Sequence, residues 1–388
     1  MSVRKRKWVT RSGEERGAWI VDYVDRNGAR CIETFAKKKE ADERETAING
    51  DKIAGTFVAP RKSLTVKQAG ESWIKAAEVA KLERATIAQY RQHLDLHIAP
   101  LIGMVKLSDL NAAGVRLFAD QLRTTASAHT EKPRTPALIR KIIVSLGSLF
   151  ADAQEQGLAA RNPVRDLHRG QQRGKKRRVE RRQKGKLKVG IDIPEPAEIA
   201  AIVAHVKGRW RPLLMTAIFT GLRASELRGL RWADVDLKAS KIRVRQRADR
   251  YNNIGPLKSE AAEREVPLPP LVANTLKEWK LACPKGDLDL VFPNGSGNVE
   301  SLANIINRGL IRAQPAKAKY TGMHTLRHFY ASWCINRRED GGLGLLPKRV
   351  QERLGHSSIV MTMDRYGHLF PTGDDGAELA EAERALLA

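Results

Sequence analysis

The pattern of polar and apolar residues in the first part of the chain predicts a small sheet followed by a helix. Residues 18–24 are rich in β-branched and aromatic side chains, and residues 30–35 alternate polar and apolar positions. Asn27 and Gly28 lie between these segments and form a dipeptide typical of a tight hairpin turn. Residues 37–48 are charged and contain neither glycine nor proline, so they predict a helix after the strands.

From residue 64 to 166, apolar residues recur at helical spacing in four segments. Thr65 is placed to cap the first predicted helix. The other three predicted helices span residues 86–97, 108–122 and 136–156. Pro100 is expected to end the second of them, and Asn162-Pro163 to close the whole helical segment.

Residues 169–190 differ in composition from both of their neighbours. They hold eleven lysines and arginines against a single acid, Glu180, and have too few apolar residues to bury a core of their own. The segment is either a solvated linker or a tether that lies along phosphates, and its place between two folded blocks favours the tether. The candidate DNA-binding residues in it are Lys175, Lys176, Arg177, Arg178, Arg181 and Arg182.

A mixed block of helices and short strands begins at Ile193. Helices are predicted over 196–204 and 210–219, and strands over 241–247 and 265–268. Helices dominate from there to the end of the chain. The pattern as a whole therefore predicts several domains that are mainly helical and carry small β elements.

Charge and composition narrow the class of partner. The chain has 69 lysines and arginines against 44 acids, a formal net charge of +25, which indicates a polyanionic partner such as DNA or RNA. The three cysteines are far apart and form no disulfide framework, which is typical of a reducing compartment. We find no signal peptide, no apolar run long enough to span a membrane, no HExxH and no Walker phosphate loop.

Four short segments of the last block concentrate reactive side chains. Each has an ordinary interpretation when taken alone, because single surface arginines, loop lysines and C-terminal tyrosines are common. The candidates are Arg223 and Glu226 in the first segment, Lys258 in the second, His324 and Arg327 in the third, and His356 with Tyr366 in the fourth.

Taken together, these residue types suit phosphoryl transfer on a nucleic-acid backbone without a metal ion. The transition state gathers negative charge on the non-bridging oxygens, which planar guanidinium groups bind bidentately. Cations held in place around those oxygens supply most of the electrostatic stabilisation. A tyrosine oxygen can form a covalent intermediate, while lysine and histidine act as acid and base for the sugar oxygen and the phenol.

Five stretches of this block resemble the tyrosine recombinases, the phage integrase family. They are TGLRASEL from 220, the loop lysine in PLKSEAAEREVPL from 256, HTLRH from 324, LGHSSIVMT from 354 and DRYGHLF from 364, and they occur in the family's order. Residues 64–166 also resemble the family's helical core-binding domain. Residues 1–60 resemble the arm-binding domain of phage-type integrases at the level of the fold.

The resemblance implies a role for each phosphate-directed residue. Arg223 and Arg327 would clamp the scissile phosphate, and His356 would hydrogen-bond one of its oxygens. Glu226 would orient the cluster from behind, although an exposed helix acid is an equally good interpretation of this residue.

The resemblance also implies how the bond is broken. Tyr366 would attack, leaving a 3′-phosphotyrosyl link and a free 5′-hydroxyl. Lys258 would protonate the leaving 5′ oxygen, and His324 would be the general base or proton shuttle. No cofactor and no metal are expected, because the phosphotyrosyl bond stores the energy and the arginines take the place of a metal.

The implied fold is that of a multidomain, mainly α protein. Its parts are an arm-type DNA-binding domain of three strands and a helix (1–60), an all-helical, SAM-like core-binding domain (64–166), a basic linker (167–192), and a catalytic domain with the α+β tyrosine recombinase fold (193–388).

The implied function is that of a site-specific recombinase, the integrase of a phage, genomic island or conjugative element. Its partners would be double-stranded DNA attachment sites, three further copies in a homotetramer on synapsed DNA, and accessory DNA-bending and directionality factors. It would act in the cytoplasm at the nucleoid, with no membrane partner. The alternatives are a type IB topoisomerase-like nicking-closing enzyme and a catalytically silent DNA-binding regulator.

Some features depart from the family pattern. Phe329 and Tyr330 follow His328 where the family usually carries serine or threonine, and residues 336–346 are longer than a compact turn. His328 and His368 flank the motifs and are expected to be packed or solvent-facing, without catalytic roles.

The C-terminal end predicts one more helix, over residues 377–387. Leu379, Leu386 and Leu387 are available for packing on it. The helix either closes over its own catalytic domain or, as the family resemblance implies, is exchanged with a neighbouring protomer.

Overall fold

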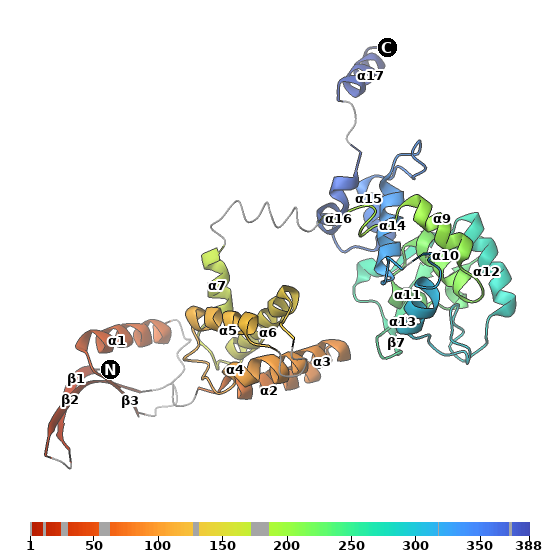
Figure 1. The fold of residues 1–388 in the computed structure, drawn as a ribbon. Helices are drawn as coiled ribbons and strands as arrows, with labels where there is room; N and C mark the ends of the chain where they lie inside the picture. Colours follow the sequence, from red (N-terminus) through yellow and green to blue (C-terminus); the bar gives the residue numbers. More distant parts are fainter. Residues whose placement is uncertain are drawn as a thin grey trace. The chain divides into compact units, whose positions relative to one another are not determined.

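The computed structural model describes residues 2–10, 13–24, 30–53, 63–126, 132–171, 186–316, 318–371 and 375–388. The chain divides into two compact units, Met1–Lys175 and Lys176–Ala388, and each is described by itself. Helices make up most of both units, and small antiparallel sheets accompany them (Figure 1).

The first unit begins with a three-stranded antiparallel sheet and one helix. The strands β1 (Ser2–Val9), β2 (Glu15–Val24) and β3 (Arg30–Phe35) pair in chain order, and α1 (Lys38–Ile53) follows them (Figure 1). Val21 of β2 is buried with Ala41 and Ile48 of α1, so one face of the sheet packs on the helix. The predicted strands and helix are confirmed, whereas the predicted turn at Asn27-Gly28 lies outside the described residues.

The rest of the first unit is helical. Its elements are α2 (Val66–Val79), α3 (Arg84–His93), the π-helical turn η2 (Leu94–Ile98), α4 (Ala99–Ile102), α5 (Ala112–Thr124), α6 (Pro136–Glu155) and α7 (Pro163–Gln171). Thr65 caps α2 as predicted, because its hydroxyl accepts from the Gln68 backbone N–H at 3.3 Å. Phe118, Ile142 and Leu146 lie in one apolar core.

Two helix boundaries in this unit differ from the prediction. The second predicted helix starts at Arg84 and continues through η2 into α4. Pro100 does not end it: the helix passes through the π-helical turn η2, where the Ala99 N–H donates to the Leu94 carbonyl, and Pro100 lies at the start of α4. The third starts only at Ala112, because the Asn111 side chain accepts from the Gly114 N–H at 2.9 Å and caps α5 there.

Pro163 begins a helix instead of closing the helical segment. The Asn162 side chain accepts from the Val164 N–H at 3.2 Å and donates to the Gly147 carbonyl at 2.8 Å. Asn162 thereby caps α7 and ties its start to α6, and Pro163 occupies the first helical position that proline favours.

The second unit is a mixed block of helices and two small sheets. The elements are α9 (Pro196–His205), α10 (Trp210–Thr220), α11 (Ala224–Gly229), η3 (Trp232–Asp234), β4 (Val235–Asp236), β5 (Lys241–Val244), β6 (Gln246–Ala248), β7 (Ile254–Pro256), η4 (Glu260–Ala262), β8 (Arg264–Pro267), α12 (Pro270–Ala282), α13 (Leu302–Asn304), η5 (Ile305–Leu310), α14 (His324–Ile335), α15 (Pro347–Leu354), α16 (Ile359–Tyr366), η6 (Gly367–Leu369) and α17 (Asp375–Leu387). The sheet order is β4-β5-β8, and Ile242 and Val244 of β5 are buried in the core formed with the helices.

The predicted strand over 241–247 is two strands in different sheets. The break falls at Arg245, whose guanidinium binds Asp234 with an Nε–Oδ1 distance of 2.7 Å. After this break β6 pairs with β7 in a two-stranded sheet of its own. The strand predicted over 265–268 is confirmed as β8, which pairs with β5.

The remaining predictions concern the basic linker, the C-terminal helix and membrane-spanning segments. All six basic candidates between 175 and 182 lie outside the described residues. Leu187 belongs to the core of the second unit, and its carbonyl accepts from His368 Nε2 at 2.7 Å. Leu379, Leu386 and Leu387 of α17 are all exposed. No helix in the described residues is long and apolar enough to cross a membrane.

Candidate active site

The first motif folds as a helix, a glycine turn and a second helix. Gly221 ends α10 in the left-handed conformation, with φ 61°, which glycine adopts without strain. A Cβ at this position would lie 2.3 Å from Tyr330 Cδ1, so there is also no room for a side chain. Arg223 then stands at the N-cap of α11, and its guanidinium binds Glu226 and the Gly355 carbonyl.

The LGH motif repeats the same local design. Leu354 ends α15 in the core, Gly355 caps it with φ 61°, and Ser358 begins α16 by accepting from the Met361 N–H at 3.4 Å. His356 lies between the two helices and is buried. Both motifs therefore place a catalytic candidate just after a glycine-terminated helix.

The two candidate arginines donate hydrogen bonds to backbone carbonyls at the ends of these helices. Arg327 donates from NH1 to the Gly221 carbonyl at 2.6 Å and from NH2 to the Leu354 carbonyl. Arg223 donates from NH2 to the Gly355 carbonyl at 3.1 Å. Because helix C-termini carry partial negative charge, they stabilise the two cations side by side. The structure thus brings Arg223 and Arg327 to adjacent residues of one turn.

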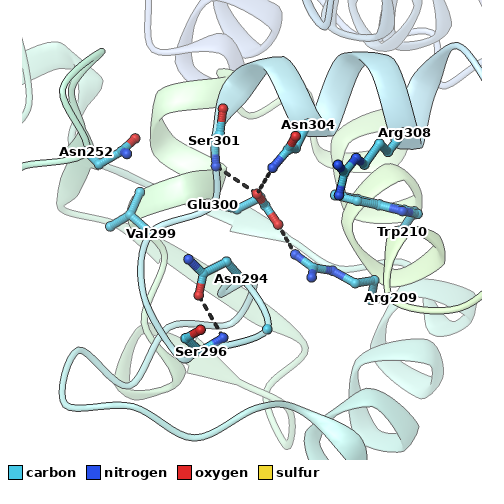
Figure 2. A pocket seen from close by; sticks show the side chains of 11 residues that line it. Arg209, Trp210, Asn252, Asn294, Ser296, Val299, Glu300, Ser301, Asn304 and Arg308 are labelled. Atoms are coloured by element: carbon cyan, nitrogen blue, oxygen red, sulfur yellow. Dashed lines mark hydrogen bonds and ion pairs between the residues drawn. The ribbon is translucent and has the colours of Figure 1, made fainter.

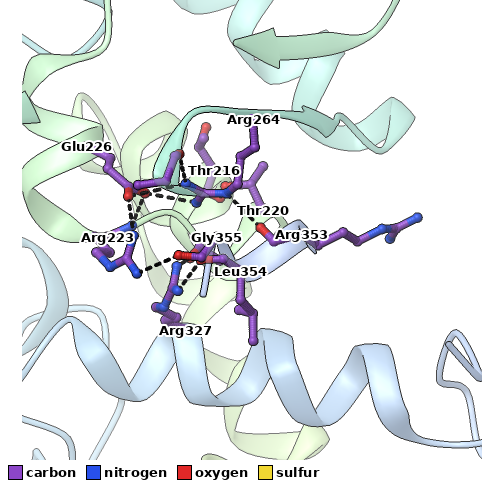
Figure 3. A network of polar contacts seen from close by, with 11 residues as sticks. Thr216, Thr220, Arg223, Glu226, Arg264, Arg327, Arg353, Leu354 and Gly355 are labelled. Atoms are coloured by element: carbon purple, nitrogen blue, oxygen red, sulfur yellow. Dashed lines mark hydrogen bonds and ion pairs between the residues drawn. The ribbon is translucent and has the colours of Figure 1, made fainter. Parts of the chain in front are cut away.

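Glu226 joins the arginines into one network, shown in Figure 3. Its carboxylate accepts from Arg223 NH1 at 2.7 Å and from the Arg223 backbone N–H at 2.8 Å. It also binds Arg264 NH2 at 2.9 Å. Glu226 is 2% exposed, so the interpretation as an exposed helix acid is wrong.

Arg264 is a member of this network that the sequence pattern does not reveal. Its guanidinium also donates to the Arg353 carbonyl at 2.8 Å and to the Ala262 carbonyl at 2.8 Å, and its side chain is 6% exposed. Arg264 therefore ties the start of β8 to the end of α15 beneath the active-site arginines (Figure 3). Nothing in the spacing of the sequence distinguishes it from the other arginines nearby.

Tyr366 is the last residue of α16, and its hydroxyl points into the protein. The hydroxyl oxygen lies 2.8 Å from His328 Nδ1, and both side chains are buried. The ring of His356 lies parallel to the Tyr366 ring, with 6.3 Å between centroids and 4° between planes. His324 contacts His328 edge-on at 5.6 Å. A continuous set of contacts therefore runs from Tyr366 to three histidines.

The environment keeps these histidines neutral. Burial, with a further contribution from Arg327, lowers the pKa of His356 to about 4. Burial, with His324 and nearby arginines, lowers the pKa of His328 to about 4. The pKa of His324 is also below its ordinary value, because the surrounding protein removes water and Arg327 repels a proton.

The phenol itself is held protonated. Burial raises the pKa of Tyr366 above its ordinary value, although Arg327 and Arg365 act in the opposite direction. Burial and Arg223 lower the pKa of the Arg327 guanidinium to about 9, which leaves it cationic at neutral pH. The cluster therefore combines fixed cations, neutral proton acceptors and a protonated phenol, and a phenol of this kind could act as a nucleophile only with the help of a proton acceptor.

Lys258 is the one catalytic candidate that the structure does not place in this buried group. It lies in the bend between β7 and η4, with an exposed side chain. His324, at the first position of α14, keeps part of its surface in solvent, while its ring lies against His328 in the cluster. Among the described residues, no group of three or more histidine, cysteine or acidic side chains is arranged to hold a metal ion.

A separate polar pocket in the same unit is lined by Arg209, Asn304 and Arg308, among others (Figure 2). Its volume is about 300 Å³. Glu300 is buried in it and binds Arg209, the Ser301 N–H at 2.9 Å and Asn304 Nδ2 at 3.0 Å. Protein groups already satisfy the hydrogen-bonding capacity of this carboxylate. Glu300 therefore joins the start of α10 to α13.

Gly221→Ala is expected to destabilise the second unit by at least about 2 kcal/mol. The added Cβ meets Tyr330 and is forced into a positive φ, so the turn that holds Arg327 must move. Gly208→Ala is the matched control, because Gly208 has φ 59° with no atom within 4 Å of the added Cβ. Urea unfolding of the full chain measures both, and equal losses would show that the Tyr330 contact is unimportant.

The chain is similar in sequence to one protein family and to two named proteins. A protein-family model described as the phage integrase family matches residues 195–372. A tyrosine recombinase XerC-like protein of Caldanaerobacter subterraneus subsp. tengcongensis is 26% identical over 401 residues, which cover 95% of this chain and 96% of the relative. The prophage integrase IntR of Escherichia coli K12 is 26% identical over 296 residues, which cover 69% of this chain and 66% of that protein.

Solved structures share the fold. The Tn1549 transposon integrase in complex with a circular intermediate DNA matches with a TM-score of 0.62 at 20% identity, covering 83% of this chain and 100% of the other. A lambda integrase tetramer bound to a Holliday junction matches with a TM-score of 0.52 at 14% identity, covering 91% and 95%. The predicted fold class, mainly helical with small sheets, is thereby confirmed.

Proposed function

We propose that the chain is a site-specific DNA recombinase of the phage integrase family of tyrosine recombinases, because the model of that family matches residues 195–372 and a tyrosine recombinase XerC-like protein is similar along nearly the whole chain. It would cut and rejoin DNA through a 3′-phosphotyrosyl intermediate and integrate or excise a phage, genomic island or conjugative element. One observation carries the proposal. Arg223, Arg327, His356 and Tyr366 come from segments far apart in sequence and meet around one turn of the second unit.

The arginines supply the site for the scissile phosphate. Arg223 is the more accessible of the two, with 30% of its side chain exposed, and its orientation is held by Glu226. Arg327 is 3% exposed and is fixed by two carbonyls. Guanidinium groups held in place by the protein can stabilise the charge that develops on the phosphate oxygens. His356, whose Nδ1 lies 2.9 Å from Thr362 Oγ1, would bind a phosphate oxygen through its other nitrogen.

Tyr366 supplies the nucleophile, and Lys258 the proton for the leaving group. The phenol oxygen attacks the phosphorus, and the bond from phosphorus to the 5′ oxygen breaks. Lys258 lies on an exposed bend, where it can approach the 5′ oxygen of bound DNA and protonate it. Rejoining reverses these steps with the 5′-hydroxyl of the partner strand, so the phosphotyrosyl bond conserves the energy of the broken linkage.

The described state is closed to substrate. Tyr366 is 2% exposed and Arg327 is 3% exposed, so a DNA phosphate cannot reach either of them directly. Cleavage therefore requires that DNA binding uncovers the side chains of Tyr366 and Arg327. A closed resting state would also prevent attack on non-cognate DNA.

Covalent trapping tests the proposed function. The full chain is mixed with nicked duplexes taken from the DNA that flanks its own gene, in the presence of a chelator, and run on a denaturing gel. A protease-sensitive slow band is expected, and peptide mapping of that band should find the DNA remnant on Tyr366. A band that forms only with Mg²⁺, or a remnant on another residue, would refute the mechanism.

The same experiment separates the two alternatives. A type IB topoisomerase-like enzyme would form the adduct on supercoiled DNA of any origin and relax it. A catalytically silent regulator would bind the flanking DNA without forming an adduct. The recombinase proposal requires an adduct confined to particular sites, followed by strand exchange between two of them.

The remaining parts of the chain would hold the DNA. We propose an arm-type DNA-binding domain over 1–60, a core-binding domain over 64–166, a basic linker over 167–192 and a catalytic domain over 193–388. Attachment-site duplexes would be the substrates, with accessory DNA-bending and directionality factors. A protein acting on chromosomal sites would work at the nucleoid, in the cytoplasm.

Replacing the six basic residues between 175 and 182 with glutamine is expected to weaken DNA binding about equally on cognate and unrelated duplexes. Basic side chains that bind phosphates fix position without reading sequence. The log–log slope of affinity against salt should fall by roughly 0.9 for each phosphate that the variant no longer neutralises. Gel-shift titrations at several salt concentrations measure both quantities. A weakening confined to the cognate duplex would mean that the linker reads bases.

A homotetramer is the proposed assembly on paired sites, and α17 is the proposed exchanged element. Leu379, Leu386 and Leu387 are exposed on α17, and α16 also exposes apolar side chains, among them Val360 and Met361. Both helices therefore have apolar surface that a second copy could cover.

Removing residues 375–388 is expected to reduce pairing of two DNA sites far more than binding to one site. Gel shifts separate the single-site complex from the paired complex. Replacing Glu381 and Glu383 with glutamine is the control, because it changes the charge of α17 while keeping its leucines. An equal loss of both complexes after the deletion would contradict the exchange of α17.

A further inference from the structure

His328 is the residue that meets the nucleophilic oxygen. Its Nδ1 lies 2.8 Å from the Tyr366 hydroxyl, between α14 and α16. His328 is 8% exposed and Tyr366 is 2% exposed, so water does not compete for this hydrogen bond. By contrast, His324 meets His328 edge-on at 5.6 Å, at the exposed start of α14.

We propose that His328 is a catalytic residue, the base that takes the phenol proton from Tyr366 when the tyrosine attacks. This inference rests on the proposed function. It deepens that function by separating the work of the two histidines of the HTLRH motif. His328 serves the nucleophile, whereas His324 stands beside the arginines that bind the phosphate.

The charges around His328 suit this task. His324 and Arg327 face it from α14, Arg365 and Tyr366 from α16, and Asp192 from the turn before α9. In the resting state burial, assisted by the cations Arg365 and Arg327, holds the imidazole neutral, so a ring nitrogen can accept a hydrogen bond from the phenol. A bound phosphate would offset those cations. His328 would then become a stronger base when the substrate is in place.

The proposed step transfers one proton to His328 and exchanges one bond at phosphorus for another. The proton of the Tyr366 hydroxyl passes to His328 Nδ1, and the imidazole, which already carries a proton on Nε2, becomes an imidazolium. The phenol oxygen forms the bond to phosphorus, and the 5′ oxygen leaves with a proton from a separate acid. In rejoining, the 5′-hydroxyl attacks the phosphorus and returns its proton to the acid that supplied it, and the departing phenol recovers its proton from His328.

His328→Asn provides the test, because an asparagine oxygen occupies nearly the position of Nδ1 and can accept a hydrogen bond but not a proton. Single-turnover cleavage of a nicked duplex by the full chain is expected to slow by roughly 100-fold or more. DNA binding should be retained. Placing the more acidic 3-fluorotyrosine at position 366 of this variant should restore much of the rate, because a more acidic phenol needs less help from a base.

The controls separate the possible outcomes. His205→Asn replaces an exposed histidine at the end of α9 and should cleave at the wild-type rate. If His328→Asn cleaves within a few-fold of wild type, or is slow without rescue by fluorotyrosine, the proposal is overturned. If the wild-type chain itself forms no adduct, the failure lies with the proposed function instead.

A second measurement does not depend on how well the variant folds. ¹⁵N-histidine spectra of the wild-type full chain report which ring nitrogen of His328 carries the proton. We expect the proton on Nε2 at neutral pH, with Nδ1 accepting from Tyr366. A proton on Nδ1 would make His328 a donor to the phenol and would overturn the proposal.

Discussion

Tyr366→Phe is expected to abolish covalent attachment to DNA while leaving DNA affinity within a few-fold of wild type. The variant lacks only the phenol hydroxyl, whose oxygen is the atom proposed to attack the phosphorus. The phenylalanine ring can keep its parallel packing on His356. The hydrogen bond to His328 is removed, which costs about 1 kcal/mol and does not threaten the fold. Denaturing gels with nicked duplexes and gel shifts on the same DNA measure the two quantities.

Tyr320→Phe is the matched control for that experiment. Tyr320 is also buried in the second unit, and its hydroxyl donates to Glu198 at 2.6 Å. The control therefore removes a buried phenol oxygen and one hydrogen bond, yet it should still form the adduct. Adduct formation by Tyr366→Phe at any appreciable rate would mean that another residue attacks the DNA.

Much of the candidate site could be predicted because its motifs are local. Gly221 and Gly355 end helices where only glycine fits the left-handed turn, and Arg223 and His356 follow them within two residues. Such short-range relations are visible in a sequence. The strand over 30–35 is visible for the same reason, since alternation with a period of two marks a strand with one face turned inward.

The rest of the site depends on long-range contacts. Arg264 meets Glu226 across 38 residues, and the sequence around it shows only a charged strand start. The burial of His328 agrees with the expectation of a packed side chain. Its contact with Tyr366, however, is created by the packing of α14 and α16, which no spacing rule gives. The prediction for Pro163 is wrong because a proline that ends one segment also suits the first position of the next helix.

Glu226→Ala is expected to lower the free energy of unfolding of the second unit by roughly 3–5 kcal/mol. The carboxylate is the counter-ion for Arg264 and Arg223, and its removal leaves the buried Arg264 cation uncompensated. Glu226→Gln keeps the shape and part of the hydrogen bonding, so it should lose less. Cleavage should also slow in both variants, because Arg223 loses the group that orients it.

The loss should depend on pH in a definite direction. Burial acts to raise the pKa of Glu226, but Arg264 and Arg223 outweigh burial and hold the pKa below its ordinary value of 4.5. Such a carboxyl contributes stability that is fully present above that value and is lost as the pH falls through the pKa in the folded state. The difference in unfolding free energy between wild type and Glu226→Gln should therefore shrink in acid.

Glu265→Gln is the control that isolates burial. Glu265 also pairs with two cations, Lys241 at 3.1 Å and Arg243 at 3.0 Å, but these pairs lie on the surface of the sheet. Solvent screens exposed pairs, so this variant should unfold close to wild type. If Glu226→Ala were as mild as Glu265→Gln, the network beneath the arginines would not be what holds them. Arg223 and Arg327 would then depend on the helix-end carbonyls alone, and Gly221→Ala would become the more damaging change.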